Sequence, residues 1–212
     1  YYDWEEPFIA AKACYDVIRR HGKEVVIMEP VKGGMLAEVP EKAKAMMEEN
    51  SKTLSPASYA IRFAASLEGV IAVLSGMSNI EQVEDNLSYM EHFEPLTEKE
   101  QEILTVAKAE YMKKWKYACE NWEALDENAY QVPVSGILRA YNSLQLQPNP
   151  YFGAELNYYK SFRSGYDRAY EKGDYSKAEE KIGHAFHVKE ALKEAIEFET
   201  KNSFQGYVSD EE

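Results

Sequence analysis

Two short loops carry the residue types best suited to chemistry in this 212-residue sequence. Lys32-Gly33-Gly34 follows the apolar run Val25–Met28, and Ser75–Asn79, which contains Gly76, follows the apolar run Val70–Leu74. Glycine has no side chain to block an approaching phosphate and tolerates positive φ, so such loops can hold phosphate through backbone amides. Each loop also has a simpler interpretation, as an ordinary turn or as the N-cap of the following helix.

Thiol and metal chemistry find little support in the sequence. Cys14 and Cys119 have no paired spacing, which excludes a disulfide framework and a cysteine-rich metal site. His184 and His187 are spaced i, i+3 but have no cysteine beside them, so we interpret the spacing as coincidence and predict no metal site.

The two loops are expected to follow parallel β-strands. The two apolar runs are short and β-branched and show no alternation, which predicts strands buried on both faces. Helices are predicted between and after them, with N-terminal signals at Ser55-Pro56 and in the capping box Thr97–Glu100, whose helix should reach about Trp115. This order of helices and strands is typical of a parallel α/β unit. Two strands cannot close a sheet, so we expect either further strands upstream of this chain or self-association that hides the incomplete sheet.

The composition is that of a globular protein, with 45% hydrophobic and 29% charged residues. A net charge of -13 argues against a nucleic-acid partner, because Lys and Arg contacts to phosphates dominate that kind of affinity. No segment approaches the roughly 20 apolar residues that span a bilayer, and the first residues lack the basic and apolar regions of a secretory signal. We expect a cytoplasmic protein with no membrane partner, whose sequence begins partway through a longer chain.

Three stretches, taken in order, resemble the aldo/keto reductase family. Val25–Leu36 resembles the seventh barrel strand and its loop, Ser55–Ala64 the helix that follows, and Val73–Leu87 the eighth strand, phosphate loop and last barrel helix. The resemblance covers residues 1 to about 110. It implies an α/β fold in which residues 1–112 are the C-terminal part of a (β/α)8 TIM barrel.

Residues 113–212 resemble the ferredoxin-like extension found in one subgroup of that family, through Val132–Asn142 and Val188–Ala195. The pattern there is helical, so an all-α extension is expected. Relatives in the subgroup bind 4Fe-4S clusters through C-x2-C-x2-C-x3-C-P runs. The corresponding stretches here, Cys119–Ala129 and Ala178–His187, contain a single cysteine, and we therefore expect no 4Fe-4S cluster.

The resemblance implies an oxidoreductase that reduces a small carbonyl substrate with NADPH or NADH. The Asp, Tyr, Lys and His that catalyse this reaction in the family come from early barrel strands, which would lie upstream of Tyr1. We therefore assign no catalytic residue and expect this chain alone to be inactive. The cofactor contacts implied for this chain are Met28, Pro30, Val31, Gly33, Gly34, Gly76, Met77, Ser78, Asn79, Gln82, Asp85 and Asn86.

These residues have different implied roles. The Gly33-Gly34 loop is expected at the pyrophosphate, and Gly76–Asn79 at the adenosine 2′-phosphate. Gln82 stands where an Arg often pairs with that phosphate, which leaves the choice between NADP and NAD open. Met28 stands where many relatives stack a Tyr on nicotinamide, with plain core packing as its alternative interpretation.

Asp85 and Asn86 match an acidic–Asn pair that contacts adenine, although Asp85 could equally be a solvated charge on a helix. The alternative for the chain as a whole is a non-catalytic scaffold or interaction protein derived from a reductase. The missing cluster cysteines and the tyrosine-rich extension motivate that alternative.

Overall fold

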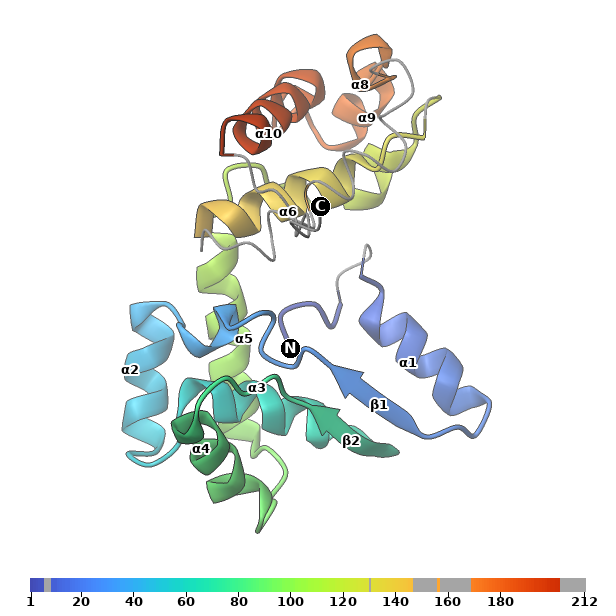
Figure 1. The fold of residues 1–212 in the computed structure, drawn as a ribbon. Helices are drawn as coiled ribbons and strands as arrows, with labels where there is room; N and C mark the ends of the chain where they lie inside the picture. The colour runs from blue at the N-terminus through green and yellow to red at the C-terminus, as the bar shows by residue number, and fades with distance from the viewer. Residues whose placement is uncertain (6–8, 130, 147–155, 157–168, 203–212) are drawn as a thin grey trace, which may run out of the picture. The chain divides into compact units, whose positions relative to one another are not determined.

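The computed structural model describes residues 1–5, 9–129, 131–146, 156 and 169–202 (Figure 1). The chain divides into two compact units, Tyr1–Lys113 and Lys114–Glu212, and each is described here by itself. The assignment of residues 1–112 to a barrel and of residues 113–212 to a ferredoxin-like extension stays a prediction. Within the described ranges, no helix has the length and apolar character that crossing a membrane requires.

Unit 1 contains a parallel two-stranded sheet formed by β1 (Val25–Met28) and β2 (Val70–Leu74). Both strands have the bounds that the apolar runs predict. Met28 pairs with Leu74 at the carboxyl ends, so the two strands stop at the same level of the sheet. An irregularity in the pairing lies between Val25 and Val26.

Side-chain caps set the starts of three helices in unit 1. α3 (Pro56–Ala65) begins after Ser55, α4 (Ile80–Met90) after Asn79, and α5 (Glu98–Met112) after Thr97 with its reciprocal partner Glu100. The predicted end of this last helix near Trp115 is wrong, because α5 ends at Met112. The remaining helices of unit 1 are α1 (Ala11–Arg20), the 3-10 turn η1 (Met35–Ala37) and α2 (Glu41–Asn50).

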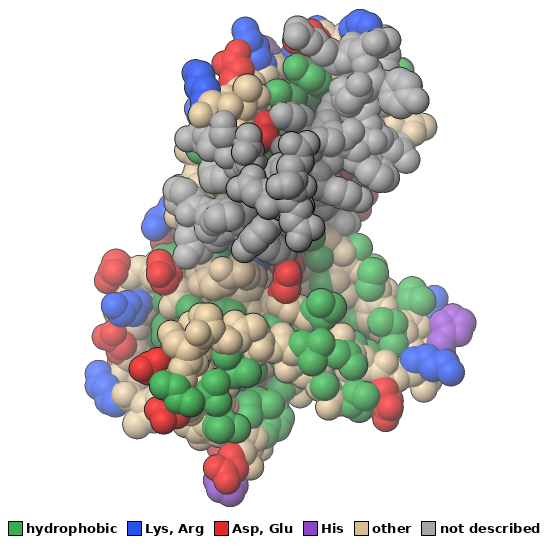
Figure 2. Space-filling view, viewed as in Figure 1, with side chains coloured by type: hydrophobic (Ala, Val, Ile, Leu, Met, Phe, Trp, Pro, Cys, Tyr) green, Lys and Arg blue, Asp and Glu red, His purple; other side chains and the backbone are tan. Residues whose placement is uncertain are grey.

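The expectation that both faces of the strands are buried is wrong for this chain. α3 packs against β2 and α1 packs against β1, and Val25 is buried. The side chains of Val26, Met28, Ile71 and Leu74 are nevertheless 49%, 72%, 61% and 51% exposed. Figure 2 shows hydrophobic side chains gathered over this part of unit 1. An exposed apolar surface of this kind is typical of a contact surface. The self-association predicted from the sequence would use it. Sedimentation velocity at two protein concentrations tests this, and we expect the sedimentation coefficient to rise with concentration.

A buried ion pair joins α3 to α5. The Arg62 guanidinium donates to the Glu100 carboxylate at 2.6 and 3.2 Å, and the two side chains are 6% and 5% exposed. Arg62 also donates to the Glu94 and Pro95 carbonyls, at 3.1 and 3.3 Å, in the segment that leads into α5. Burial raises the pKa of Glu100, but the hydrogen bonds from Arg62 and Thr97 outweigh it, so its pKa lies below the ordinary value.

The described residues of unit 2 form helices and no strand. They are η2 (Trp122–Asp126), α6 (Val134–Leu146), α8 (Ala169–Lys172), α9 (Ser176–Lys181) and α10 (Val188–Asn202). α6 packs against both η2 and α10. Ile137, Leu138 and Leu144 of α6 and Leu192 of α10 are fully buried between them.

The Glu194 carboxylate connects α10 with α6 and with residues 116–117 of unit 2. Glu194 of α10 accepts hydrogen bonds from the Tyr117 hydroxyl at 2.6 Å, from the Tyr141 hydroxyl of α6, and from the Lys116 ammonium. Asn142 holds the same segment by accepting from the Lys116 and Tyr117 amides, both at 3.2 Å. Burial raises the pKa of Glu194, but the hydrogen bonds from these three donors have the larger effect and lower the pKa to about 2.

We expect unit 2 to lose the contribution of Glu194 in acid. The pKa of Glu194 is lower in the folded protein than its ordinary 4.5, so its stabilisation is complete above about pH 4.5 and is lost as the pH falls toward about 2. Because the side chain is 37% exposed, solvent screening limits the contribution to about 1 kcal/mol. Glu194→Gln should therefore lower the urea midpoint at pH 7 and have little effect at pH 2.5.

Urea unfolding followed by tryptophan fluorescence measures this effect, since Trp115 and Trp122 report on unit 2. Glu197→Gln is the matched control on the same helix, because the Glu197 side chain is 55% exposed and its ion pair with Lys193 is long, at 3.9 Å. An equal loss at both pH values for Glu194→Gln would show that the carboxylate charge plays no part.

Candidate cofactor site

Two glycine-bearing loops leave the same edge of the sheet. Because β1 and β2 are parallel and end together at Met28 and Leu74, residues 29–34 and 75–79 both begin at the carboxyl edge (Figure 1). In open parallel α/β structures and in barrels, ligands bind outside the carboxyl ends of the strands. The structure thus places the two predicted phosphate loops on the side where a ligand would be expected.

The first loop has an unusual run of left-handed backbone. Lys32, Gly33 and Gly34 have φ of 50°, 62° and 95°, and Glu29 has φ of 52°. At Gly34 a side chain would be strained by that φ, although a Cβ there would meet nothing within 4 Å. Both glycines are exposed, so the space beside them is open to a ligand.

Two amides of this loop, and two that follow it, are already used by loop carbonyls. The N–H groups of Lys32 and Gly34 donate to the Glu29 and Val31 carbonyls at 3.0 and 3.1 Å, and those of Met35 and Leu36 donate to loop carbonyls as well. These bonds fix the backbone shape. They also mean that a ligand would meet a preformed turn and not an open row of amides.

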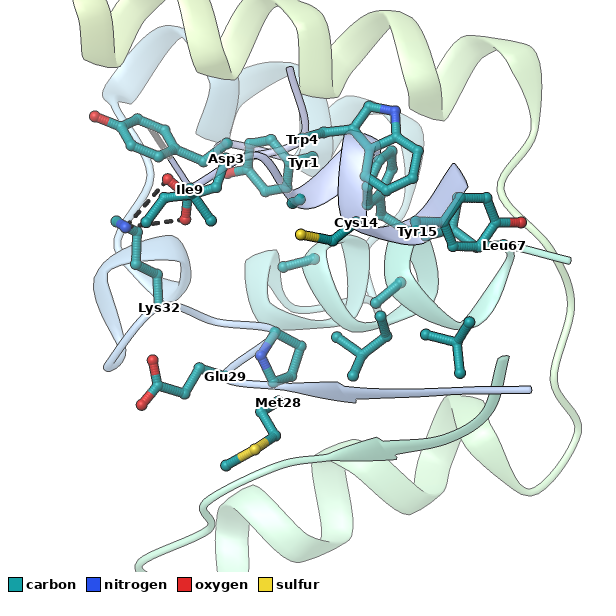
Figure 3. Close-up of a pocket in the computed structure, with 18 of the residues that line it drawn as sticks. Tyr1, Asp3, Trp4, Ile9, Cys14, Tyr15, Met28, Glu29, Lys32 and Leu67 are labelled. Carbon is teal, nitrogen blue, oxygen red and sulfur yellow. Dashed lines mark hydrogen bonds and ion pairs between the residues drawn. The ribbon is translucent and has the colours of Figure 1, made fainter. Parts of the chain in front are cut away.

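Side chains from distant parts of the sequence anchor the first loop. The Lys32 ammonium, in a side chain 8% exposed, lies 2.9 Å from the Asp3 carboxylate and 5.6 Å from the centre of the Tyr2 ring (Figure 3). The Tyr111 hydroxyl of α5 lies 2.9 Å from the Met35 carbonyl and 3.2 Å from that of Glu38. Neither anchor was predicted from the sequence, since nothing in the local pattern connects residue 32 with 3 or 35 with 111.

The second loop is closed by side chains of its own helix. Asn79 Oδ1 accepts the Gln82 amide at 2.9 Å, as an N-cap does. Gln82 Oε1 in turn accepts the Ser78 amide at 2.8 Å and the Ser78 hydroxyl at 3.2 Å. Gly76 is exposed, and a Cβ there would meet nothing within 4 Å.

Asp85 and Asn86 have partners within unit 1. Asp85 accepts the Ser55 hydroxyl at 2.6 Å, which connects α4 to the N-cap of α3. Asn86 donates to the Ser75 hydroxyl at 3.1 Å and accepts the Tyr89 hydroxyl at 2.5 Å. Both side chains are half-buried, and Asn86 holds the second loop against its helix. The contact with adenine expected of them stays a prediction.

Comparison with known proteins places this region in a family. Residues 6–108, which include both strands and both loops, match the model of the aldo/keto reductase family. This part of the chain is therefore similar to the aldo/keto reductase family. The family supports an oxidoreductase type of function, implies a barrel-like α/β fold and generally uses NAD(P)H. Neither the comparison with curated proteins nor that with solved structures gave a match.

Unit 2 lies beyond the aldo/keto reductase match, which ends at residue 108. Its likeness to a ferredoxin-like extension stays a prediction. Across the described residues of the chain, no three His, Cys, Asp or Glu side chains come together in a way that could hold a metal ion. Cys119 is half-buried in this unit and Cys14 is exposed in unit 1.

The nicotinamide end of the aldo/keto reductase cofactor was expected near Met28, with Pro30 and Val31 at the strand end beside the pyrophosphate loop. Met28 is 72% exposed and points away from the Asp3–Lys32 pair, which shows that the alternative interpretation as core packing is wrong for this chain (Figure 3). Pro30 and Val31 are half-buried beside it, and Met77 in the second loop is 43% exposed. An exposed thioether can offer an apolar contact to a flat ring.

A separate cavity of about 290 Å³ lies along β1, between α1, α3 and the first residues of the chain. Aromatic side chains dominate one wall, with Trp4 in edge contact with Tyr15 and Phe63. Lys32 and Asp3 lie at one end of this cavity, and no residue of the loop 75–79 lines it. Met28, Glu29 and Pro30 also line the cavity, so it adjoins the first loop and is separate only from the second.

A proton donor for carbonyl reduction cannot be assigned among the described residues of unit 1. Burial raises the pKa of Tyr59, Tyr89 and Tyr111, which makes each a weaker acid than an ordinary tyrosine. A general acid is most effective with a pKa near the working pH. The expectation that this chain carries no catalytic residue stays a prediction.

Proposed function

We propose that this chain supplies the phosphate-binding side of the nicotinamide-dinucleotide site of an aldo/keto-reductase-type oxidoreductase. The single observation that carries the proposal is that two exposed, glycine-bearing loops leave the carboxyl edge of one parallel sheet. The family match adds the ligand class, because aldo/keto reductases generally use NAD(P)H.

In this proposal the two loops hold opposite ends of the dinucleotide. Gly33 and Gly34 allow the pyrophosphate to approach the backbone, and the N-terminus of α4 faces the adenosine end with its partial positive charge. Met28, Pro30 and Val31 lie on the nicotinamide side. The full set of proposed contacts is Met28, Pro30, Val31, Gly33, Gly34, Gly76, Met77, Ser78, Asn79, Gln82, Asp85 and Asn86.

Reduction of a small carbonyl substrate needs a hydride from the bound cofactor and a proton for the resulting oxyanion. The residues described in this chain position and orient the cofactor, and they offer no tuned acid. We propose that the acid and its supporting residues come from polypeptide outside this sequence, and that this chain alone does not turn over.

A fluorescence titration with NADH and NADPH tests the proposal, with Gly34→Ala as the key variant. A Cβ at φ of 95° strains the loop and enters the open space beside it, so we expect dinucleotide affinity to fall about tenfold, equivalent to about 1.4 kcal/mol. Gly22→Ala is the matched control, since Gly22 also has positive φ (65°) and open space but precedes β1, at the opposite end of the strand.

The proposal predicts normal binding by Gly22→Ala and weaker binding by Gly34→Ala at similar folding stability. Equal loss in both variants would mean that the first loop does not contact the cofactor.

Absence of binding by the unmodified chain would favour the second candidate function, a non-catalytic scaffold. Unit 2 favours that candidate through one observation: Cys119 is the single cysteine beyond unit 1, and one thiolate cannot hold a 4Fe-4S cluster. Stoichiometric iron with broad visible absorption in the purified protein would overturn the expectation that no cluster is bound.

A further inference from the structure

Several donors at the start of α4 already have partners, which an anion would have to displace. A phosphate at a helix N-terminus binds to N–H groups that have no partner within the helix. Here the Gln82 amide donates to Asn79 Oδ1, and the Ser78 amide and hydroxyl both donate to Gln82 Oε1. Because a backbone N–H can only donate, the atom of Gln82 that faces Ser78 must be its oxygen and not its nitrogen.

The charge around this loop has the wrong sign for an added phosphate. Glu81, Glu84 and Asp85 all fall in the first two turns of α4, and residues 63–98 contain no Lys or Arg. Glu81 and Glu84 are exposed, so their carboxylates face the solvent from which a ligand would arrive. A phosphate monoester carries close to two negative charges at neutral pH, and such a group would be repelled by these carboxylates.

A ribose with a free 2′-hydroxyl has the opposite requirements. The hydroxyl is neutral and donates one hydrogen bond, which a carboxylate can accept. In dinucleotide sites generally, an acidic residue on the 2′-hydroxyl goes with NAD, whereas an arginine accommodates the 2′-phosphate of NADP. The described part of the second loop offers hydrogen-bond acceptors and negative charge, which suit a free 2′-hydroxyl.

We propose that the second loop selects NAD(H) over NADP(H), with Gln82 as the specificity-determining residue and Glu81 as its electrostatic support. This inference rests on the proposed function, because it concerns the adenosine end of the same site. Gln82 acts by keeping the Ser78 donors occupied, and Glu81 acts by repelling a second phosphate. The substrate class of the site is therefore a dinucleotide whose adenosine ribose is not phosphorylated.

The test is to measure the Kd of the full chain for NADH and for NADPH, with 5′-ADP and 2′,5′-ADP as minimal probes of the adenosine end. We expect NADH to bind at least about tenfold more tightly than NADPH at low salt, and the ratio to shrink as salt screens the carboxylates. Gln82→Arg should shift the ratio of the two Kd values by about tenfold or more in favour of NADPH, since it frees the Ser78 donors and adds a cation. Glu81→Gln should change the ratio in the same direction by a smaller factor.

Gln101→Arg is the matched control, because Gln101 is also exposed on a helix of unit 1 and the change in charge is the same. Circular dichroism checks that α4 persists in Gln82→Arg, and Glu81→Gln tests the inference without touching the cap. Equal or tighter binding of NADPH by the unmodified chain would overturn this inference and leave the proposed function standing. Binding of neither dinucleotide would overturn the proposed function, and this inference with it.

Discussion

Arg62→Met is expected to destabilise unit 1 by about 3–5 kcal/mol, the cost of leaving a buried charge without its partner. Glu100 would keep a carboxylate that is 5% exposed and would lose the guanidinium that faces it at 2.6 Å. The Glu94 and Pro95 carbonyls would lose a donor in the same change. Chemical unfolding of unit 1 measures the effect, and α3, β2 and the second loop should lose structure together because α3 packs on β2.

Two further variants separate the charge effect from simple loss of packing. Arg19→Met is the matched control: Arg19 pairs with Glu68, whose side chain is 87% exposed, so the loss should stay within about 1 kcal/mol. The double variant Arg62→Met with Glu100→Met should recover part of the lost stability, because it removes both charges. A single variant as stable as the control, or a double variant less stable than Arg62→Met alone, would contradict a strong role for this ion pair.

Lys32→Met is expected to weaken dinucleotide binding by about tenfold, because a loop that is no longer held in shape must be ordered on binding. The Lys32 ammonium connects the first loop to Asp3 at 2.9 Å and is almost wholly buried. Its loss should also lower the stability of unit 1 by about 2 kcal/mol, since it removes a charged hydrogen bond. Titration with NADH measures the first effect and urea unfolding the second.

The Asp3→Asn variant distinguishes positioning from direct contact. If Lys32 holds the loop through Asp3, as the geometry indicates, Asp3→Asn should weaken binding in the same way. If Lys32 instead contacts a cofactor phosphate directly, removing the competing carboxylate should strengthen binding. Lys32→Arg should retain most of the affinity, and Lys23→Met, at an exposed lysine before β1, should have no effect.

Local patterns in the sequence were sufficient for the elements of unit 1 that position the site. The two strands have the predicted bounds, because a short β-branched apolar run between polar loops favours a strand. Ser55 and Thr97 begin helices as predicted, and Asn79 caps α4 as the alternative interpretation of its loop had it, since a cap depends on residues three positions apart. These features are encoded within a few neighbouring residues.

The features missed by sequence reasoning depend on residues far apart in the chain. Arg62 and Glu100 are separated by 38 positions, Lys32 and Asp3 by 29, and Tyr117 and Glu194 by 77. A charged residue in an amphipathic pattern is usually assigned to the solvent, so nothing local marks these as buried. The exposure of Met28 and Ile71 was missed for a related reason. An apolar run predicts that the side chains of a strand are covered, but it does not show whether the covering residues belong to this chain.

The most direct test of the central claim is hydrogen–deuterium exchange of the full chain with and without saturating NADH. If the two loops hold one dinucleotide at the carboxyl edge of the sheet, exchange should slow in residues 29–36 and 75–82 together, while α2 and the helices of unit 2 remain unchanged. Unchanged exchange in both loops, or slowing confined to other parts of the chain, would contradict the account.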